Sequence, residues 1–228
     1  MRTYKNLNIG NREIILSSLK ALADYSTNVE DYRNAFLSLG IELGKVLAEK
    51  YNDIPPTQIM LGCASEDADW LGTGVECGFN KGKLKKSIYW NSRETVFEDS
   101  TGHKTEIAPI EKAFEEQMDN CQLLIIVKSI ISSSCVVKTQ LTRLIGHLCP
   151  TQIAIAAPVM YRDGEPNLRK EFPDEISRKF QFFTFAIDDE RKGSEVVPGI
   201  GGMVYPRLGL GDINEKNSYI PSVVLEHL

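Results

Sequence analysis

The sequence predicts an α/β protein in which a mostly parallel sheet is covered by helices on both faces. Short runs at 58–62, 122–127 and 151–157 consist mainly of apolar residues, and segments with helical spacing separate them. Strands that lack polar alternation are typical of parallel sheets buried on both sides. The 228 residues suit one domain better than two, so we expect a single domain over 1–228.

The N-terminal part of the chain is predicted to form two helices. Residues 12–24 carry apolar side chains at helical spacing. Thr27–Asn28 is a capping pair for a second helix that runs to about Tyr51. We therefore treat 1–28 as a helical extension ahead of the sheet.

The rest of the chain alternates between expected strands and helices. After a proline pair we expect, in order, a strand at 58–62, a loop at 63–69, a helix near 70–77, a β-ribbon flap at 86–98, a helix at 109–119, a strand at 122–127, a helix from about 135 to 148, and strands at 151–157 and 180–187. The ribbon is expected to pair 87–90 with 95–97.

Composition narrows the classes of function. The net charge is −5 and the pI is about 5.4, which does not favour a general nucleic-acid-binding protein. The five cysteines are odd in number and widely spaced, and no C-x-x-C pair occurs, so the zinc and redox patterns are absent. The sequence has no apolar run of membrane-spanning length. We expect a cytoplasmic protein with no membrane partner.

A serine-rich turn between a strand and a helix is the strongest candidate for binding phosphate. The residues concerned are Ser132, Ser133, Ser134, Cys135 and Val136. The first N–H groups of a helix have no partner within it, and the helix dipole favours an anion there. A helix cap without a ligand is the competing interpretation.

A glycine-rich segment near the C-terminus is the second candidate. Glycines allow the backbone to approach a ligand closely. Arg207 offers donors for a phosphate or a base edge; a purely structural loop is the alternative. The candidate base-binding, or hood, residues are Val197, Gly199, Ile200, Gly201 and Arg207, within a hood segment at 188–212.

The order of these pieces resembles the uracil phosphoribosyltransferase branch of the type I phosphoribosyltransferases. The resemblance runs from about residue 29 to 211. It is carried by Asp31–Arg33, Ile88–Tyr89 with Asn91–Thr95, Ile125–Cys135, Ala156–Pro158, Ala186–Asp188, Val197–Gly201, Arg207 and Gly209. It implies the type I phosphoribosyltransferase fold, a mobile flap, and a loop for phosphoribosyl pyrophosphate ahead of the helix at 135.

The chain departs from this family at the reactive positions. Lys128 and Ser129 stand where the family has acids that orient ribose hydroxyls, and Ser134 and Cys135 replace glycines. Glu66, Asp67 and Asp69 occupy the diphosphate loop, where carboxylates repel a diphosphate unless a metal intervenes. Asp67 and Asp69 are the candidate ligands for a magnesium ion.

Three functions follow from the resemblance and its departures. The first is a regulatory or complex subunit that binds a nucleotide or phosphorylated sugar with little or no catalysis. The second is an active uracil or other nucleobase phosphoribosyltransferase that uses phosphoribosyl pyrophosphate and magnesium. The third is a nucleic-acid-associated effector or defence-system subunit. The resemblance also implies at least a homodimer.

The nucleic-acid hypothesis depends on one basic stretch. The lysines at 81, 83, 85 and 86 lie close in sequence to Tyr89, Trp90 and Arg93. Lysines next to aromatic residues grip single strands in some nucleic-acid-binding proteins. A solvated hairpin is the simpler alternative.

Overall fold

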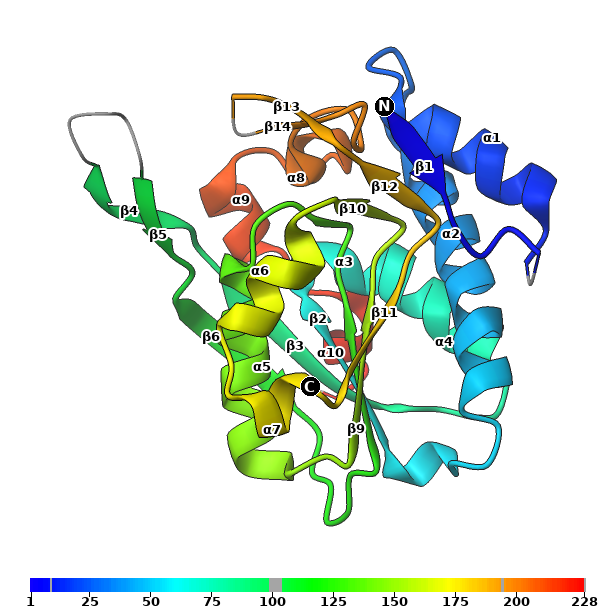
Figure 1. Ribbon diagram of the computed structural model, residues 1–228, viewed down its shortest axis with the longest axis vertical. Coiled ribbons are helices and arrows are strands. Elements are labelled where there is room, and N and C mark those ends of the chain that lie inside the picture. Colours follow the sequence, from blue (N-terminus) through cyan, green and yellow to red (C-terminus); the bar gives the residue numbers. More distant parts are fainter. Residues whose placement is uncertain (9, 99–103, 194, 228) are drawn as a thin grey trace.

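The computed structural model describes the whole chain except residues 9, 99–103, 194 and 228. A six-stranded sheet forms its centre (Figure 1). In spatial order its strands are β11 (Phe180–Phe183), β9 (Gln152–Ala156), β7 (Leu123–Val127), β2 (Ile59–Ala64), β3 (Lys85–Asn91) and β6 (Ile110–Glu115). All neighbours are parallel except β6, which runs antiparallel to β3. The predicted α/β class and parallel sheet are confirmed.

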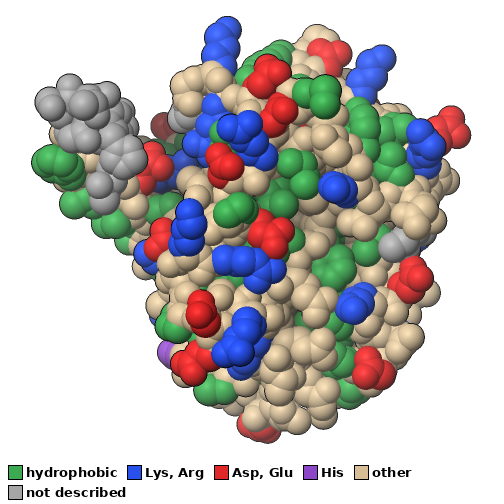
Figure 2. Space-filling model, in the orientation of Figure 1, with side chains coloured by type: hydrophobic (Ala, Val, Ile, Leu, Met, Phe, Trp, Pro, Cys, Tyr) green, Lys and Arg blue, Asp and Glu red, His purple; other side chains and the backbone are tan. Residues whose placement is uncertain are grey.

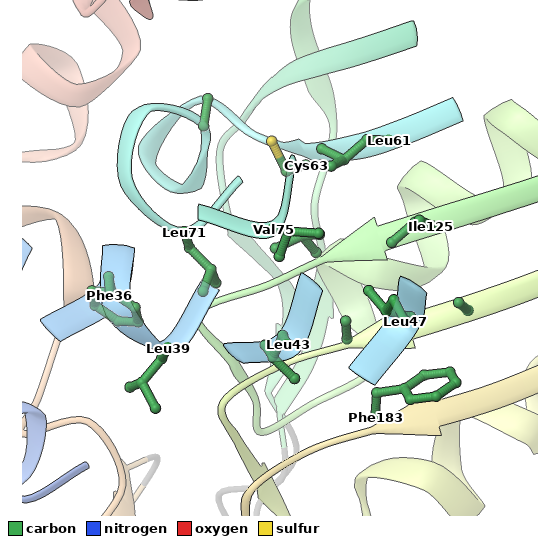
Figure 3. Packing of buried hydrophobic residues seen from close by; sticks show 14 of the residues in the cluster. Phe36, Leu39, Leu43, Leu47, Leu61, Cys63, Leu71, Val75, Ile125 and Phe183 are labelled. Carbon is green, nitrogen blue, oxygen red and sulfur yellow. The ribbon is translucent and has the colours of Figure 1, made fainter. Parts of the chain in front are cut away.

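Helices cover both faces of this sheet. On one face lie α1 (Arg12–Ala23), α2 (Val29–Lys50) and α4 (Thr73–Phe79), and on the other lie α5 (Cys135–Leu148), α6 (Gly164–Lys170) and α7 (Asp174–Ser177) (Figure 1). The side chains of β7 alternate between two apolar cores: Ile125 packs on the α2 side and Ile126 on the α5 side. Figure 3 shows Leu39, Leu43 and Leu47 of α2 directed into the first core.

Glycines set the distance between α2 and α4. A Cβ atom on Gly44 would lie 2.2 Å from the carbonyl oxygen of Val75, and one on Gly78 would lie 1.9 Å from that of Ile41. No side chain fits at such distances, so the two backbones approach more closely than in ordinary helix packing. This close contact fixes α4 against α2, directly after the helical turns that follow β2.

A smaller sheet lies beyond the carboxyl ends of the central strands. Its order is β1 (Arg2–Tyr4), β12 (Ala186–Asp188), β10 (Val159–Tyr161) and β8 (Ile130–Ile131), with only β1 antiparallel. Beside it lie β13 (Glu190–Lys192), β14 (Glu195–Val197), α8 (Val204–Arg207) and α9 (Ile213–Ser218). These elements form a cover over the sheet edge where parallel strands usually place a binding site.

Several sequence-based boundaries were wrong. Residues 63–69 are not a loop, because β2 continues to Ala64 and leads into α3 (Ser65–Asp67) and a π-helical turn at Ala68–Gly72. Residues 110–115 form β6 instead of a helix, since pairing with β3 satisfies their backbone. The run at 180–187 forms two strands, β11 in the central sheet and β12 in the smaller sheet. Between them, the N–H groups of Phe185 and Ala186 donate to the Pro158 carbonyl.

The expected flap ribbon at 86–98 also needs correction. Its first half is the buried strand β3, which pairs with β2 and β6. Its second half, β4 (Glu94–Glu98), pairs instead with β5 (Lys104–Ile107). This β4–β5 ribbon projects from the body, and Figure 2 shows apolar side chains along it. Val96 and Phe97 are each 61% exposed.

The C-terminal segment, with α10 (Ser222–Leu225), returns to the main sheet. The indole nitrogen of Trp90 donates a hydrogen bond to the carbonyl of Tyr219, and the Tyr219 ring stacks on Trp70. Within the described residues, no helix is long and apolar enough to cross a membrane.

Candidate functional site

A cavity of about 240 Å³ opens at the carboxyl ends of β2, β3 and β7. Residues from the carboxyl ends of these strands line it together with the serine-rich turn, the hood segment and α9. Its lining includes Glu66, Asn91, Arg93, Lys128, Ser129, Ser132, Val136, Glu195, Ile200, Gly202, Tyr205 and Lys216. This is the place at which open parallel sheets bind ligands.

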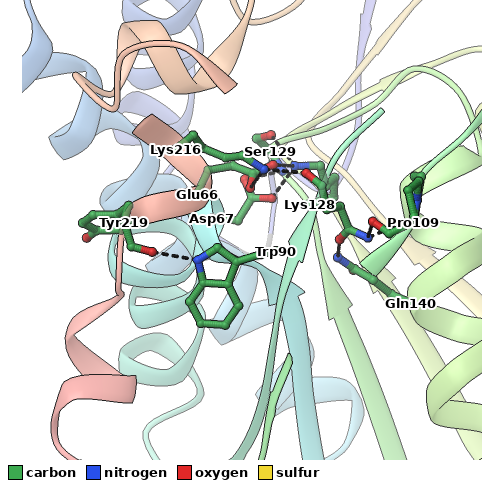
Figure 4. A network of polar contacts seen from close by, with 11 residues as sticks. Glu66, Asp67, Trp90, Pro109, Lys128, Ser129, Gln140, Lys216 and Tyr219 are labelled. Carbon is green, nitrogen blue, oxygen red and sulfur yellow. Dashed lines mark hydrogen bonds and ion pairs between the residues drawn. The ribbon is translucent and has the colours of Figure 1, made fainter. Parts of the chain in front are cut away.

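Charged side chains in close contact form the floor of the cavity (Figure 4). The Lys128 ammonium lies 2.5 Å from a carboxylate oxygen of Asp67 and 3.0 Å from Oε1 of Glu66. The second oxygen of Asp67 accepts the backbone N–H of Ser129 at 3.1 Å. Lys128 directly follows β7, and the two acids lie in α3, directly after β2; β2 and β7 are neighbours in the sheet.

The pKa values of the floor residues follow from burial and charge. Burial alone would lower the pKa of Lys128, but Asp67 and Glu66 outweigh this effect and the pKa lies above its ordinary value. Burial would raise the pKa of Glu66, but Lys128 and Lys216 hold it below its ordinary value. Lys128 and Glu66 therefore keep their charges at neutral pH, whereas burial holds the pKa of Asp67 above its ordinary value.

Lys216 and Asn91 extend this network toward the hood. The Lys216 ammonium donates to the carbonyl oxygen of Asn91 at 2.6 Å. The Asn91 side chain accepts from Gln140 at 2.9 Å and donates to the carbonyls of Ala108 and Pro109. Burial holds the pKa of Lys216 below its ordinary value. Helix α9 is thereby fixed to the end of β3.

The serine-rich turn borders the same cavity. Ser132 and Val136 line it, while Ser133, Ser134 and Cys135 belong to the turn behind them. The Ser134 hydroxyl is 3.4 Å from Glu171, and the Cys135 thiol is 3.4 Å from the Glu106 carbonyl of the projecting ribbon. The Ser133 hydroxyl is buried and has no hydrogen-bond partner among the described residues.

The hood segment divides into cavity-lining and structural residues. Ile200 lines the cavity, as does its neighbour Gly202. Gly199 and Gly201 have positive φ values of 54° and 69°, so they shape the turn. Val197 ends β14 and is partly exposed.

Arg207 ties the hood to the rest of the protein. Its guanidinium donates to four backbone carbonyls, those of Leu22, Asp24, Ile200 and Gly201. It also lies 4.0 Å above the Tyr32 ring. These contacts are those expected if Arg207 holds the hood loop in place and does not contact a ligand.

The two candidate metal ligands face different partners. Asp67 is held by Lys128 and Ser129, whereas Asp69 accepts from the Tyr219 hydroxyl and from the N–H and hydroxyl of Ser222. Among the described residues, no group of three or more His, Cys, Asp or Glu side chains is arranged to hold a metal. Lys128 thus pairs with Asp67 and with one oxygen of Glu66, and Asp69 is turned to the C-terminal segment.

The basic stretch does not form an exposed lysine–aromatic surface. Lys83, Lys85 and Lys86 pair with Glu226, Glu116 and Glu76. Tyr89 and Trp90 are buried in the main sheet. Lys85, Lys86 and the two aromatic residues lie on the largely buried strand β3, so the solvated hairpin does not describe this stretch either.

Sequence analysis missed two contributors to the floor. Lys216 lies beyond the family resemblance, on a short helix whose sequence carries no binding pattern. Glu66 was noted only as a repulsive charge. The signal that was available for Glu66 was the lysine at 128, since a buried lysine requires nearby carboxylates.

Comparisons with known proteins bear on the fold. No protein-family model and no curated protein matches the chain. Among solved structures, the AQ2163 protein from Aquifex aeolicus matches with a TM-score of 0.67 and 13% identity, over 86% of this chain and 93% of that one. The two proteins share a fold.

Two solved phosphoribosyltransferases match with lower scores. For the hypoxanthine-guanine phosphoribosyl transferase of L. donovani the TM-score is 0.38, with 11% identity over 67% of this chain and 82% of that one. For the adenine phosphoribosyltransferase of Thermoanaerobacter pseudethanolicus the TM-score is 0.38, with 10% identity over 70% and 83%.

Proposed function

We propose that this protein binds a nucleotide or phosphorylated sugar in the cavity and catalyses little or no phosphoribosyl transfer. The observation that carries the proposal is the joining of two different surfaces in one cavity. On one side lies the turn at the N-terminus of the 14-residue helix α5, represented by Ser132 and Val136. On the other lies the charged floor of Lys128, Glu66 and Asp67.

The turn supplies the chemistry for an anion. The first N–H groups of α5 have no partner within the helix, and the helix dipole attracts negative charge. The hydroxyls of the turn add donors, and the Ser133 hydroxyl has no partner in the described part of the chain. A phosphate group has the charge and the acceptors that such a turn prefers.

The floor argues against efficient phosphoribosyl transfer. The resemblance implies free acids at 128 and 129, where they would orient ribose hydroxyls as positive charge develops on the sugar. Here Lys128 occupies the first of these positions, and its ammonium forms ion pairs with Glu66 and Asp67. An ammonium next to the developing cation would oppose the reaction instead of stabilising it.

The donor set also does not fit a magnesium ion held by Asp67 and Asp69. Asp67 is bonded to an ammonium and Asp69 to the C-terminal segment, so neither carboxylate is free for a cation.

Calorimetry combined with a turnover assay tests the proposal. Purified protein is titrated with uridine monophosphate and with phosphoribosyl pyrophosphate plus magnesium, and uracil conversion is then measured. We expect saturable binding without turnover. Turnover of ordinary size, about 1 to 10³ per second, would support the active-transferase alternative, and the absence of any binding would overturn the proposal.

A charge substitution in the turn tests the location of the ligand. Ser132→Asp puts a carboxylate in the cavity beside the expected phosphate, so we expect affinity to fall at least about tenfold. Ser17→Asp, on the exposed surface of α1, is the matched control and should bind like the unaltered protein. Equal affinities for the two variants would contradict this location.

A further inference from the structure

Two buried charged groups at the cavity floor face each other across a gap. Oε2 of Glu66 lies 3.8 Å from the Lys216 ammonium, which is too far for a hydrogen bond. Glu66 is only 7% exposed and Lys216 only 2%, and both line the cavity. Among the described residues, Glu66 Oε2 has no hydrogen-bond partner. The buried carboxylate oxygen of Glu66 and the buried ammonium of Lys216 are thus close neighbours that form no hydrogen bond with each other.

The surrounding groups cannot fill this gap. Lys128 directs its ammonium to Oε1 of Glu66, to Asp67 and, at 3.4 Å, to the Ser129 hydroxyl, which accounts for its three donors. Lys216 gives one N–H to the Asn91 carbonyl and retains two others. Within the described part of the chain, no group accepts from these two N–H groups while donating to Glu66 Oε2.

The chemistry of the missing group follows from these two requirements. A hydroxyl both donates and accepts. An amino group of a base would donate to Glu66 but leave Lys216 unsatisfied. A phosphate oxygen would accept from Lys216 but be repelled by the Glu66 carboxylate. Of the groups on a nucleotide, a sugar hydroxyl is the one that meets both requirements with a single atom.

We propose that Glu66 and Lys216 together bind a sugar hydroxyl, so that the ligand is a phosphorylated sugar or ribonucleotide with its hydroxyls intact. The inference rests on the proposed function, because the phosphate of the same ligand would lie at the turn of Ser132 and Val136.

The test removes hydroxyls from the ligand one at a time. Calorimetry compares uridine monophosphate, its 2′-deoxy form, its 2′,3′-dideoxy form and inorganic phosphate. We expect the dideoxy compound to bind at least about tenfold more weakly than uridine monophosphate, since it loses hydrogen bonds to charged groups. Equal affinities for the three nucleotides would mean that a bound water alone fills the gap, and would overturn the inference.

Two variants assign the effect to these residues. In Lys216→Met the preference for the ribonucleotide should fall to within about twofold, while the affinity for inorganic phosphate stays the same. Glu66→Gln, which keeps the size of the side chain, should show the same loss of preference. Lys112→Met is the matched control: Lys112 is exposed, contacts the Asn217 carbonyl, and lies outside the cavity lining. An undiminished preference in both floor variants would overturn the inference.

Failure of the inference and failure of the proposed function give different results. Nucleotides that bind without hydroxyl preference, and compete with inorganic phosphate, contradict only the Glu66–Lys216 assignment. If neither nucleotides nor phosphate bind, both proposals are overturned.

Discussion

The floor and the hood of the cavity use buried charge in opposite ways. In the hood, the donors of Arg207 go to backbone carbonyls of the protein itself. In the floor, Lys128 is satisfied, but Glu66 retains an oxygen that has no partner among the residues the structure describes. A cation near a binding site is therefore not by itself a ligand contact. At the floor, a buried carboxylate oxygen without a partner lies on the cavity lining, and such an oxygen calls for an explanation.

The largest expected effect is the removal of the floor cation. Lys128→Met leaves the buried carboxylates of Glu66 and Asp67 without their main partner, so we expect a loss of about 3–5 kcal/mol in the free energy of unfolding. Urea unfolding at pH 7 measures it. A loss below about 1 kcal/mol would mean that the floor is not a coupled charge network.

A smaller effect is expected in the hood. Arg207→Lys removes the planar fork that reaches four carbonyls, and we expect a loss of about 2 kcal/mol in stability. Nucleotide affinity, measured well below the unfolding temperature, should change less than about threefold, because Arg207 is structural. If Arg207→Lys instead lost much of its nucleotide affinity at unchanged stability, Arg207 would be a ligand contact, which contradicts this prediction.

Lowering the pH should reduce the stabilisation of the folded protein that comes from the Glu66 carboxylate. Its pKa is lowered in the folded protein, so its contribution to stability is present above the ordinary value of 4.5 and is lost as the pH falls through the folded-state pKa. The stability difference between the unaltered protein and Glu66→Gln should therefore shrink below pH 4.5. Urea unfolding of both proteins across this range gives the comparison, and a difference independent of pH would contradict it.

Lys216 should matter for binding more than for stability. Burial lowers its pKa, so its charge is disfavoured in the folded protein, and this penalty is present below the folded-state pKa and relieved as the pH rises toward 10.5. Lys216→Met removes the penalty together with the bond to Asn91, and we expect stability to change by about 1 kcal/mol or less. Thermal unfolding measures this. A loss as large as that of Lys128→Met would make Lys216 a structural residue.

A change in the projecting β4–β5 ribbon should alter the oligomeric state of the protein and leave the cavity unchanged. Val96 and Phe97 are exposed on β4, and we propose that a second copy of the chain covers them. Light scattering with size exclusion should give a mass near twice 25.5 kDa for the unaltered protein and near 25.5 kDa for Phe97→Ser. A monomer at micromolar concentration would contradict the homodimer.

The sequence predicted the central layer well because its signals are local. The apolar runs that became β2, β7 and β9 are continuous, and Asn28 caps α2 as its residue type indicates. It failed where partners are distant in the chain. The strand β6 has polar residues that look helical alone, and only pairing with β3 makes it a strand.

The candidate site was predicted in outline but not in its chemistry. The turn at Ser132 and the hood at Ile200 do line one cavity. That Lys128 pairs with Glu66 and Asp67 depends on the adjacency of β2 and β7, which no local pattern contains. The placement of Lys216 depends on the return of the C-terminal segment to β3, more than one hundred residues earlier in the chain, where its ammonium contacts the Asn91 carbonyl.

A crystal structure of the protein with bound uridine monophosphate would locate the phosphate and the ribose together. We expect the phosphate to lie against the N-terminal turn of α5 near Ser132, and a ribose hydroxyl to contact both Glu66 Oε2 and the Lys216 ammonium. A nucleotide bound elsewhere, or a water left between Glu66 and Lys216 with the ribose turned away, would contradict this expectation.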